Sequence, residues 1–196
     1  RPGKIYYMNV TSVNGQGSST SSGNYFSTGS AAGSTGKWEV YFNKPVDNSY
    51  ALPGNNANGN TNFVTRLKQR IDSAKYSIDF AIYSFNDLTQ IRDALIQAVV
   101  RGVKLRIVYD SRTNQALMQD LINAGVLVQK RNTGTGALMH DKFMVFDYRD
   151  TTSAGDDWLW GGSANITDDQ FNVDVQNVIL MQDQAICGAY TREFIV

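Results

Sequence analysis

From Lys37 onward, short runs with strand-like patterning alternate with stretches whose apolar residues recur at helical spacing. The run at 77–84 reads SIDFAIYS, and the run at 103–109 reads VKLRIVY. Between them, the apolar residues of 88–99 recur three or four positions apart, as on one face of a helix. This alternation is typical of a layered α/β domain. We therefore expect a mixed, mostly parallel central sheet flanked by helices.

The last strand-like runs are linked differently, because no helical stretch separates the first two of them. Lys142 to Phe146 is an apolar run that we expect to pair with Trp158–Trp160, leaving YRDTTSAGDDW as a hairpin loop. Another strand is expected at 175–181 and a helix from Gln184 onward. Antiparallel pairs at this end of the sheet make it mixed.

Capping residues mark the expected helix starts. Asn60-Thr61-Asn62, Asp87 and Thr113 each precede an apolar-periodic stretch, and side chains of this kind accept hydrogen bonds from the first free backbone N–H groups of a helix. Gly102 and Gly125 follow the second and third stretches, where glycine commonly ends a helix.

Residues 1–36 differ from the rest, because 11–36 consist mostly of Gly, Ser, Thr and Asn. Such a segment buries little apolar surface and favours loop or linker. We expect residues 37–196 to form one domain, since 196 residues suffice for one core but hardly for two. The chain stops inside an apparent helix, which indicates a boundary within a longer protein.

Net charge and hydropathy limit the kinds of partner and compartment that this chain is suited to. Lys plus Arg and Asp plus Glu each total 18, and this balance argues against a strongly basic coat for non-specific nucleic-acid binding. No run of 18 apolar residues predicts a transmembrane segment. The chain does not begin with Met, so a soluble protein secreted with removal of a signal peptide remains open, as does the compartment. The single Cys187 is expected to be a buried, inert thiol.

The segment MHDKFMVFD, at 139–147, is the most informative for chemistry. His140 and Lys142 are two positions apart, so on a strand they point to the same face. Asp147 follows at the end of the run. Around His140 the sequence has no HExxH, no paired cysteines and no dense Asp cluster, so we expect no metal or other cofactor there.

A second polar group follows in Gly161-Gly162-Ser163-Ala164-Asn165. Ser163 and Asn165 are also two positions apart, and the glycines allow close backbone approach. Paired strands would bring an imidazole, an ammonium, a hydroxyl and an amide together. Such a set suits a phosphate diester, because Lys supplies charge, Ser and Asn supply hydrogen bonds, and His attacks or moves a proton.

The pattern HxK, four residues, D and then GSxN resembles the HKD signature of the phospholipase D superfamily. It is formed by His140, Lys142, Asp147, Gly162, Ser163 and Asn165, and the order of elements upstream is similar as well, so the resemblance covers roughly 37–196. It implies a phospholipase D/nuclease-like fold and a metal-independent phosphodiesterase. Its catalytic residues would be His140, Lys142, Asp147, Ser163 and Asn165, with Gly162 among those that bind substrate.

The resemblance also implies that two such motifs face each other across a two-fold or pseudo-two-fold axis. One His forms a phosphohistidine and the other protonates the leaving oxygen, while Lys and Asn hold the phosphoryl oxygens. This chain has a single His, so a homodimer or a second HKD half is expected. The family often carries an acidic residue that orients the nucleophile where Gln176 stands here, and a Gln amide oxygen would accept from the imidazole instead.

Several residues in and near the motifs also fit purely structural roles. Asp147, at a strand end, fits a role in capping a turn or backbone group as well as a place in the site. Trp158 and Trp160 are expected to pack in the core or the hairpin rather than stack on substrate. Tyr83 and Ser84 end a central strand, where α/β proteins commonly place their sites, so they are candidates for lining the cleft.

Three functions remain at this point. A nuclease-like phosphodiesterase is favoured, because small single-motif members of the superfamily are homodimeric endonucleases. A phospholipase D or phosphatidyl transferase would use the same chemistry on phospholipids with an interfacial cleft, although no amphipathic membrane stripe is evident. A non-enzymatic half-domain is disfavoured by the complete set of His, Lys, Ser and Asn.

Overall fold

The structure is a computed structural model that describes residues 4–21, 24–28, 33–131, 137–150 and 152–195. The strands are β1 (Ile5–Met8), β2 (Thr11–Asn14), β3 (Gly17–Thr20), β4 (Asn24–Ser27), β5 (Lys37–Phe42), β6 (Ser77–Ile82), β7 (Lys104–Tyr109), β8 (Leu127–Lys130), β9 (Lys142–Phe146), β10 (Trp158–Gly162) and β11 (Asn177–Gln182). The helices are α1 (Phe63–Asp72), α2 (Thr89–Val100), α3 (Gln115–Asn123) and α4 (Gln184–Ile195), with a short 3₁₀ turn η1 (Asn48–Tyr50) and a π-helical turn η2 (Asp169–Val173).

Seven strands form one sheet in the order β5-β11-β10-β9-β6-β7-β8. The pairs β6–β7 and β7–β8 are parallel, and the other neighbouring pairs of the described sheet are antiparallel. In direction, β9 and β11 therefore run opposite to the other strands described for this sheet. The expected mixed α/β sheet flanked by helices is confirmed, including the pairing of Lys142–Phe146 with the Trp158 strand. The expectation that the sheet is mostly parallel is wrong for its pairing, because parallel pairs in the described sheet are limited to β6–β7 and β7–β8, where helices connect successive strands.

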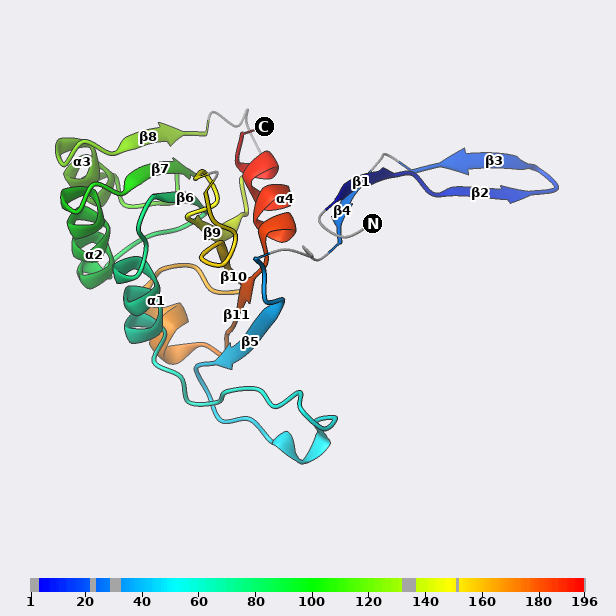
Figure 1. The fold of residues 1–196 in the computed structure, drawn as a ribbon, viewed down its shortest axis with the longest axis horizontal. Coiled ribbons are helices and arrows are strands. Elements are labelled where there is room, and N and C mark those ends of the chain that lie inside the picture. Colours follow the sequence, from blue (N-terminus) through cyan, green and yellow to red (C-terminus); the bar gives the residue numbers. More distant parts are fainter. Residues whose placement is uncertain (1–3, 22–23, 29–32, 132–136, 151, 196) are drawn as a thin grey trace.

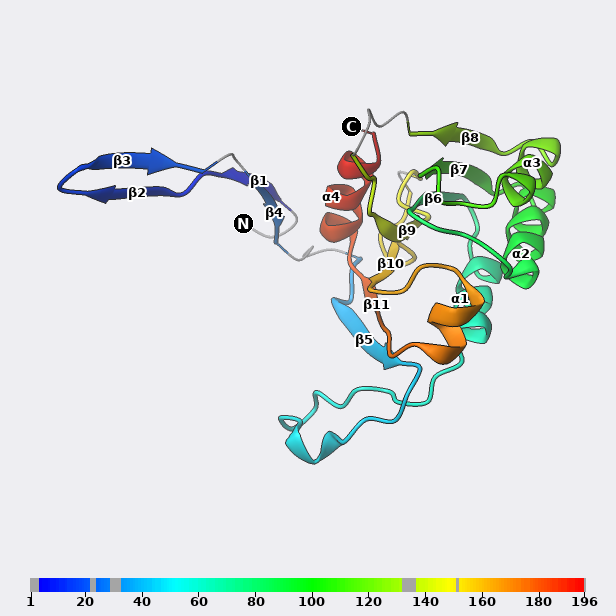
Figure 2. The same cartoon turned by 180° about the vertical axis from the view of Figure 1, so that it is seen from behind.

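Helices cover both faces of the sheet, with α1, α2 and α3 on one face and α4 on the other (Figures 1 and 2). The larger core lies under α1–α3 and includes Phe63, Leu67 and Leu95. A smaller cluster under α4 contains Phe143, Val145 and Cys187, so the single thiol is buried as expected. Among the residues that the structure describes, every helix falls short of the length and apolar character that crossing a bilayer requires.

The helix starts agree with the expected caps at one of three positions. Asn62 accepts a hydrogen bond from the Thr65 N–H at 2.9 Å, as expected. For α3 the cap is Asn114, not Thr113, whose hydroxyl instead donates to the Tyr83 carbonyl. Asp87 has a φ of 63°, outside the helical region, and α2 begins at Thr89 without a side-chain cap. The tertiary hydrogen bond of Thr113 thus accompanies a shift of the α3 cap by one residue, whereas α2 has no side-chain cap at all.

The N-terminal segment is more ordered than its composition predicted. β1 pairs with β4 and β2 pairs with β3, both antiparallel, and the β2–β3 ribbon extends away from the sheet domain (Figure 1). Every residue of β2 and β3 is exposed. As the composition predicted, none of the residues whose burial is described in this segment belongs to either hydrophobic cluster. The composition did not exclude strands, because backbone N–H and C=O groups can pair without apolar side chains.

Candidate active site

Three strand ends meet at one edge of the sheet. The backbone N–H of Tyr83, just after β6, donates to the Asp141 carbonyl, just before β9, at 2.8 Å. The Ser84 N–H donates to the side-chain oxygen of Asn165, which follows β10, at 3.2 Å. The register also places Lys142 beside Ile82 of β6. The segments that carry the predicted site residues are therefore neighbours in space, although they come from distant parts of the sequence.

Tyr83 links the two residues of the HxK pair. The His140 and Tyr83 rings lie 4.6 Å apart between centroids, inclined at 60°, and the ammonium of Lys142 lies 5.1 Å from the centre of the Tyr83 ring. Lys142 also donates to the His140 carbonyl at 2.9 Å. His140 itself is exposed, so its imidazole is open to a ligand from solvent. The structure thus brings His140 and Lys142 together around one aromatic ring.

The Lys142 ammonium is partly removed from water. Burial lowers its pKa, and the nearby Asp141 carboxylate opposes that change. A cation that has lost part of its hydration interacts more strongly with an anion that reaches it, because the local dielectric is lower. This end of the sheet can therefore attract a phosphate group.

Asn165 is held firmly by its neighbours. Only 5% of the residue is exposed. Its side-chain oxygen accepts from Ser84, while its backbone N–H and its Nδ2 both lie within hydrogen-bond distance of the Gln170 Oε1, at 2.6 and 3.1 Å. The Nδ2 group carries two hydrogens, so one can serve Gln170 and the other a ligand. Gln170, on η2, gave no signal in the sequence.

Ser163 and Gln176 form a pair of their own. The Ser163 hydroxyl donates to the Gln176 Oε1 at 2.6 Å and accepts from the Asn177 N–H at 3.0 Å. No hydrogen bond joins Gln176 to His140 within the described ranges. The expected bond from the imidazole to Gln176 is therefore not formed in this structure, where the amide oxygen orients Ser163 instead.

Gly162 stands where no side chain fits. A Cβ at this position would lie 2.3 Å from the Asn177 carbonyl oxygen and 2.9 Å from the Val178 Cα. The close packing of β10 against β11 therefore requires glycine immediately before Ser163. The neighbouring Gly161 has ordinary space around a hypothetical Cβ, with Phe143 nearest at 3.8 Å.

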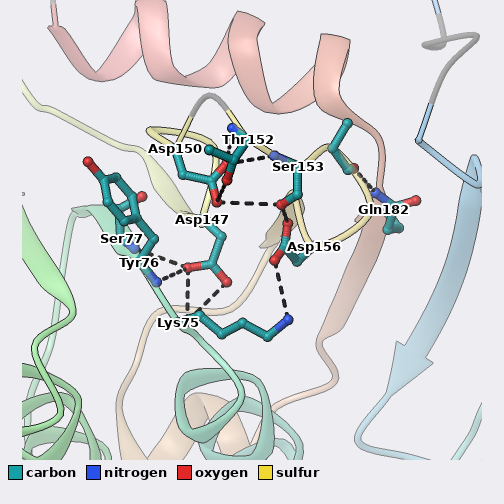
Figure 3. A network of polar contacts seen from close by, with 10 residues as sticks. Lys75, Tyr76, Ser77, Asp147, Asp150, Thr152, Ser153, Asp156 and Gln182 are labelled. Carbon is teal, nitrogen blue, oxygen red and sulfur yellow. Dashed lines mark hydrogen bonds and ion pairs between the residues drawn. The ribbon is translucent and has the colours of Figure 1, made fainter.

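Asp147 lies at the opposite end of β9, which corrects its expected place in the site. It is fully buried, with a φ of 64°, and its carboxylate accepts hydrogen bonds from the backbone N–H groups of Lys75, Tyr76 and Ser77 (Figure 3). Seven residues of extended chain separate it from His140, roughly 23 Å at the strand rise. These contacts match the backbone-capping alternative.

Asp110 is a site neighbour that the sequence analysis missed. It follows β7, is 1% exposed, and its Oδ2 accepts from the Met139 N–H at 3.1 Å while its Oδ1 accepts from the Arg112 N–H at 3.2 Å. Asp110 thereby fixes the residue before His140. The sequence held a usable signal, since an acidic residue directly after an apolar strand stands at the sheet edge where sites form.

The chain resembles known proteins in sequence. A family model described as "Cardiolipin synthase, PLD-like domain" matches residues 67–195. Mitochondrial cardiolipin hydrolase of Drosophila melanogaster is 40% identical over 89 residues, which are 43% of this chain and 33% of that protein. Phospholipase D of Rickettsia prowazekii is 30% identical over 144 residues, which are 69% of this chain and 61% of that protein. The chain thus spans less than two thirds of the length of these relatives.

Solved structures resemble it in fold. Nuc from Salmonella typhimurium, a phospholipase D family member, superposes with a TM-score of 0.60 at 24% identity, covering 81% of this chain and 91% of Nuc. NucT from Helicobacter pylori superposes with a TM-score of 0.54 at 22% identity, covering 67% of this chain and 84% of NucT. The mixed sheet with its flanking helices is therefore the fold of these proteins.

Proposed function

Because the chain belongs to the phospholipase D superfamily, through the family of cardiolipin synthase, PLD-like domains, we propose that it is a metal-independent phosphodiesterase with His140 as nucleophile. The observation that carries the proposal is the arrangement of His140 and Lys142 around Tyr83. Asn165 is joined to the same strand end through Ser84. An exposed imidazole beside a partly desolvated ammonium can attack and hold a phosphate diester at one place.

The proposed reaction has two steps. A neutral His140 imidazole nitrogen attacks phosphorus, the bond from phosphorus to the leaving oxygen breaks, and a second imidazolium gives that oxygen its proton. The second imidazole then takes a proton from water as the water oxygen displaces His140 from phosphorus. Lys142, Ser163 and Asn165 stabilise charge on the phosphoryl oxygens in both steps.

The second imidazole must come from outside this copy of the chain, which has one His. A second copy, as a homodimer, is the simplest source, and a second HKD half is the other. Wild-type and His140→Asn chains co-expressed with different tags would test this. If two copies share each site, activity falls with the square of the wild-type fraction, because mixed dimers lack one imidazole. Activity that stays proportional to the wild-type fraction, in a monomer by sedimentation, would contradict the shared site.

A nuclease-like substrate is our first candidate, because the chain covers 91% of Nuc, a compact protein of similar fold. Phospholipid is the second candidate. It is favoured by the 40% identity to a protein named cardiolipin hydrolase and by the 30% identity to one named phospholipase D. Turnover of plasmid DNA, single-stranded DNA, cardiolipin and phosphatidylcholine, each measured with EDTA present, separates the two. Loss of turnover on chelation with restoration by zinc or magnesium would overturn the metal-free mechanism.

The direct test of the nucleophile is the covalent intermediate. Enzyme quenched during turnover should carry an acid-labile, base-stable phospho-adduct on the peptide that contains His140. Ser163→Ala is the matched control, because it removes the other candidate nucleophile of the cluster and should leave the adduct in place. An adduct mapped to Ser163 would remove His140 from this role.

A further inference from the structure

The loop between β9 and β10 gathers three carboxylates at the end of the sheet opposite His140. Asp150, Asp156 and Asp157 each offer an oxygen, and these oxygens lie within 4.8 Å of one another. The Ser153 hydroxyl lies within hydrogen-bond distance of both Asp150 and Asp156 (Figure 3). Several carboxylates this close repel one another unless a cation or protons lie between them.

Asp157 makes the cluster unusual. It is 0% exposed, and neither of its carboxylate oxygens has a hydrogen bond of acceptable geometry to any described residue. Burial raises the pKa of Asp157 to about 7, and the nearby Gln184 side chain opposes that change. A buried carboxylate without a partner is costly and calls for a specific compensation.

The protein cations nearby do not supply that compensation. Lys75 reaches Asp156 at 3.4 Å, but its side chain is 74% exposed, so the pair is weak. The Arg70 guanidinium acts on Asp147 and Asp156 and lies over the Phe146 and Trp158 rings. Neither cation makes a close contact with the Asp157 carboxylate among the described ion pairs.

Hydrogen bonds from the sheet also fix part of the loop backbone near the carboxylates. The Gln182 side-chain amide, from β11, donates to the carbonyl groups of Ala154 at 2.6 Å and Asp157 at 3.3 Å. These bonds hold the 154–157 part of the loop, which carries Asp156 and Asp157, from the sheet side. A site whose ligands are already gathered loses less conformational entropy when an ion binds.

We propose that Asp150, Asp156 and Asp157 bind a calcium ion. The donor set consists of oxygens alone, which suits a hard cation, and a surface loop with water access suits the flexible coordination of Ca²⁺ better than the strict octahedron of Mg²⁺. The ion draws the three carboxylates together and gives Asp157 its missing partner. Its place is structural, about a strand length away from His140, so it takes no part in the phosphodiesterase chemistry.

Thermal unfolding of EDTA-treated protein tests the site. Ca²⁺ should raise the Tm saturably, by on the order of 5 °C at a hundredfold excess over Kd, while KCl at equal ionic strength should not. Asp150→Asn and Asp156→Asn should lose the shift and still fold, because both side chains are only half-buried. Asp93→Asn on α2, an exposed acid remote from the loop, is the matched control and should keep it.

Terbium provides a second readout. Tb³⁺ replaces Ca²⁺ in oxygen sites and emits when a nearby indole is excited, and Trp158 directly follows Asp157. Emission should appear with Tb³⁺, fall on Ca²⁺ addition, and be lost in Trp158→Phe. A Tm that does not change with Ca²⁺, or a shift retained in Asp150→Asn, would overturn the proposal. Protonation of Asp157 would then explain how its buried carboxyl group is tolerated without a partner. A shift with Mg²⁺ but not Ca²⁺ would overturn the choice of ion.

Discussion

The two ends of β9 carry polar residues under opposite conditions. At the start of the strand His140 is exposed, and Lys142 contacts the face of an aromatic ring. At the end of the strand Asp147 has no exposure, and its carboxylate is surrounded by three backbone donors. A single pattern of eight residues thus supplies an open, reactive end and a closed, fully bonded end.

The difference teaches how to separate chemistry from structure within one motif. A group that must meet a substrate keeps some of its bonding capacity unused, whereas a buried group whose bonds are all made stabilises the fold. Substitutions at the open end should change activity with little change in stability. Substitutions at the closed end should do the reverse.

His140→Asn should show the largest effect on activity. If it does not, the contrast between a reactive and a structural end of β9 does not hold. Removing the nucleophile should lower kcat by more than about 10⁴-fold. The free energy of unfolding should change by only about 0.5 kcal/mol or less, because the side chain is exposed. Steady-state turnover and urea unfolding of the same preparation measure both quantities. Retained turnover would place the nucleophile elsewhere.

Asp147→Ala tests the closed end. Three backbone N–H groups lose a charged acceptor, and alanine is strained at a φ of 64°, so the free energy of unfolding should fall by about 3–5 kcal/mol. Asp147→Asn is the matched variant. It keeps one acceptor oxygen and tolerates this φ, so its loss should be nearer to about 1–2 kcal/mol.

The activity of these two variants decides the comparison. When turnover is expressed per folded molecule at a temperature where each variant remains folded, both should match the wild type. A large fall in kcat for Asp147→Asn, with stability nearly intact, would return Asp147 to the catalytic set despite its distance from His140.

Lys142→Met should lower kcat by about 10²–10³-fold, the usual cost of removing one donor to a developing oxyanion, while methionine keeps the packing against Tyr83. In the wild type, the lowered pKa of Lys142 means that the ammonium is lost at a lower pH than in an exposed lysine. Activity that depends on it should therefore begin to fall at a lower alkaline pH. Lys142→Arg keeps its charge, so its pH–rate profile should lose that decline.

Asp110→Asn should have the smallest effect of the four. One oxygen of the carboxylate becomes an NH₂ group, so either the Met139 or the Arg112 N–H loses its acceptor. The segment before His140 should then move, lowering kcat about tenfold, or about 1.4 kcal/mol, with KM little changed. A fall in kcat that only follows the fraction of unfolded protein, with a matching loss in the free energy of unfolding, would indicate a purely structural role.

Much of the fold could be predicted from local patterning. The periodicity of 63–74 and the apolar run of β9 were sufficient to place those elements, because burial dictates the spacing of apolar side chains. The order of strands could not be obtained this way, since β9 lies beside β6 through a register that depends on contacts distant in sequence. The strands of the N-terminal segment were missed because their pairing rests on backbone hydrogen bonds and a few hydroxyl contacts, and not on an apolar pattern that the sequence would show.

The candidate site was predicted in part. Spacing predicted that His140 and Lys142 lie close together; His140 lies just before β9 and not on it, and the structure joins the two residues through Tyr83. Asp147 was grouped with them through the resemblance to the HKD signature, although a run of extended chain between them already implied a large separation. Asp110 and Gln170 were missed because their bonds go to backbone groups or neighbours that only the folded chain supplies.

The pairing of β6 with β9 also bears on how fast the protein folds. Ile78 lies opposite Phe146, and 68 positions of sequence separate them. A long loop must close before this pair can form. The chain therefore loses conformational entropy before the contact contributes any stabilising free energy, and chains rich in such distant contacts fold slowly. During synthesis, β6, β7 and their helices can assemble early as parallel neighbours. The edge of β6 then stays open to wrong partners until β9 has been made and docks beside it.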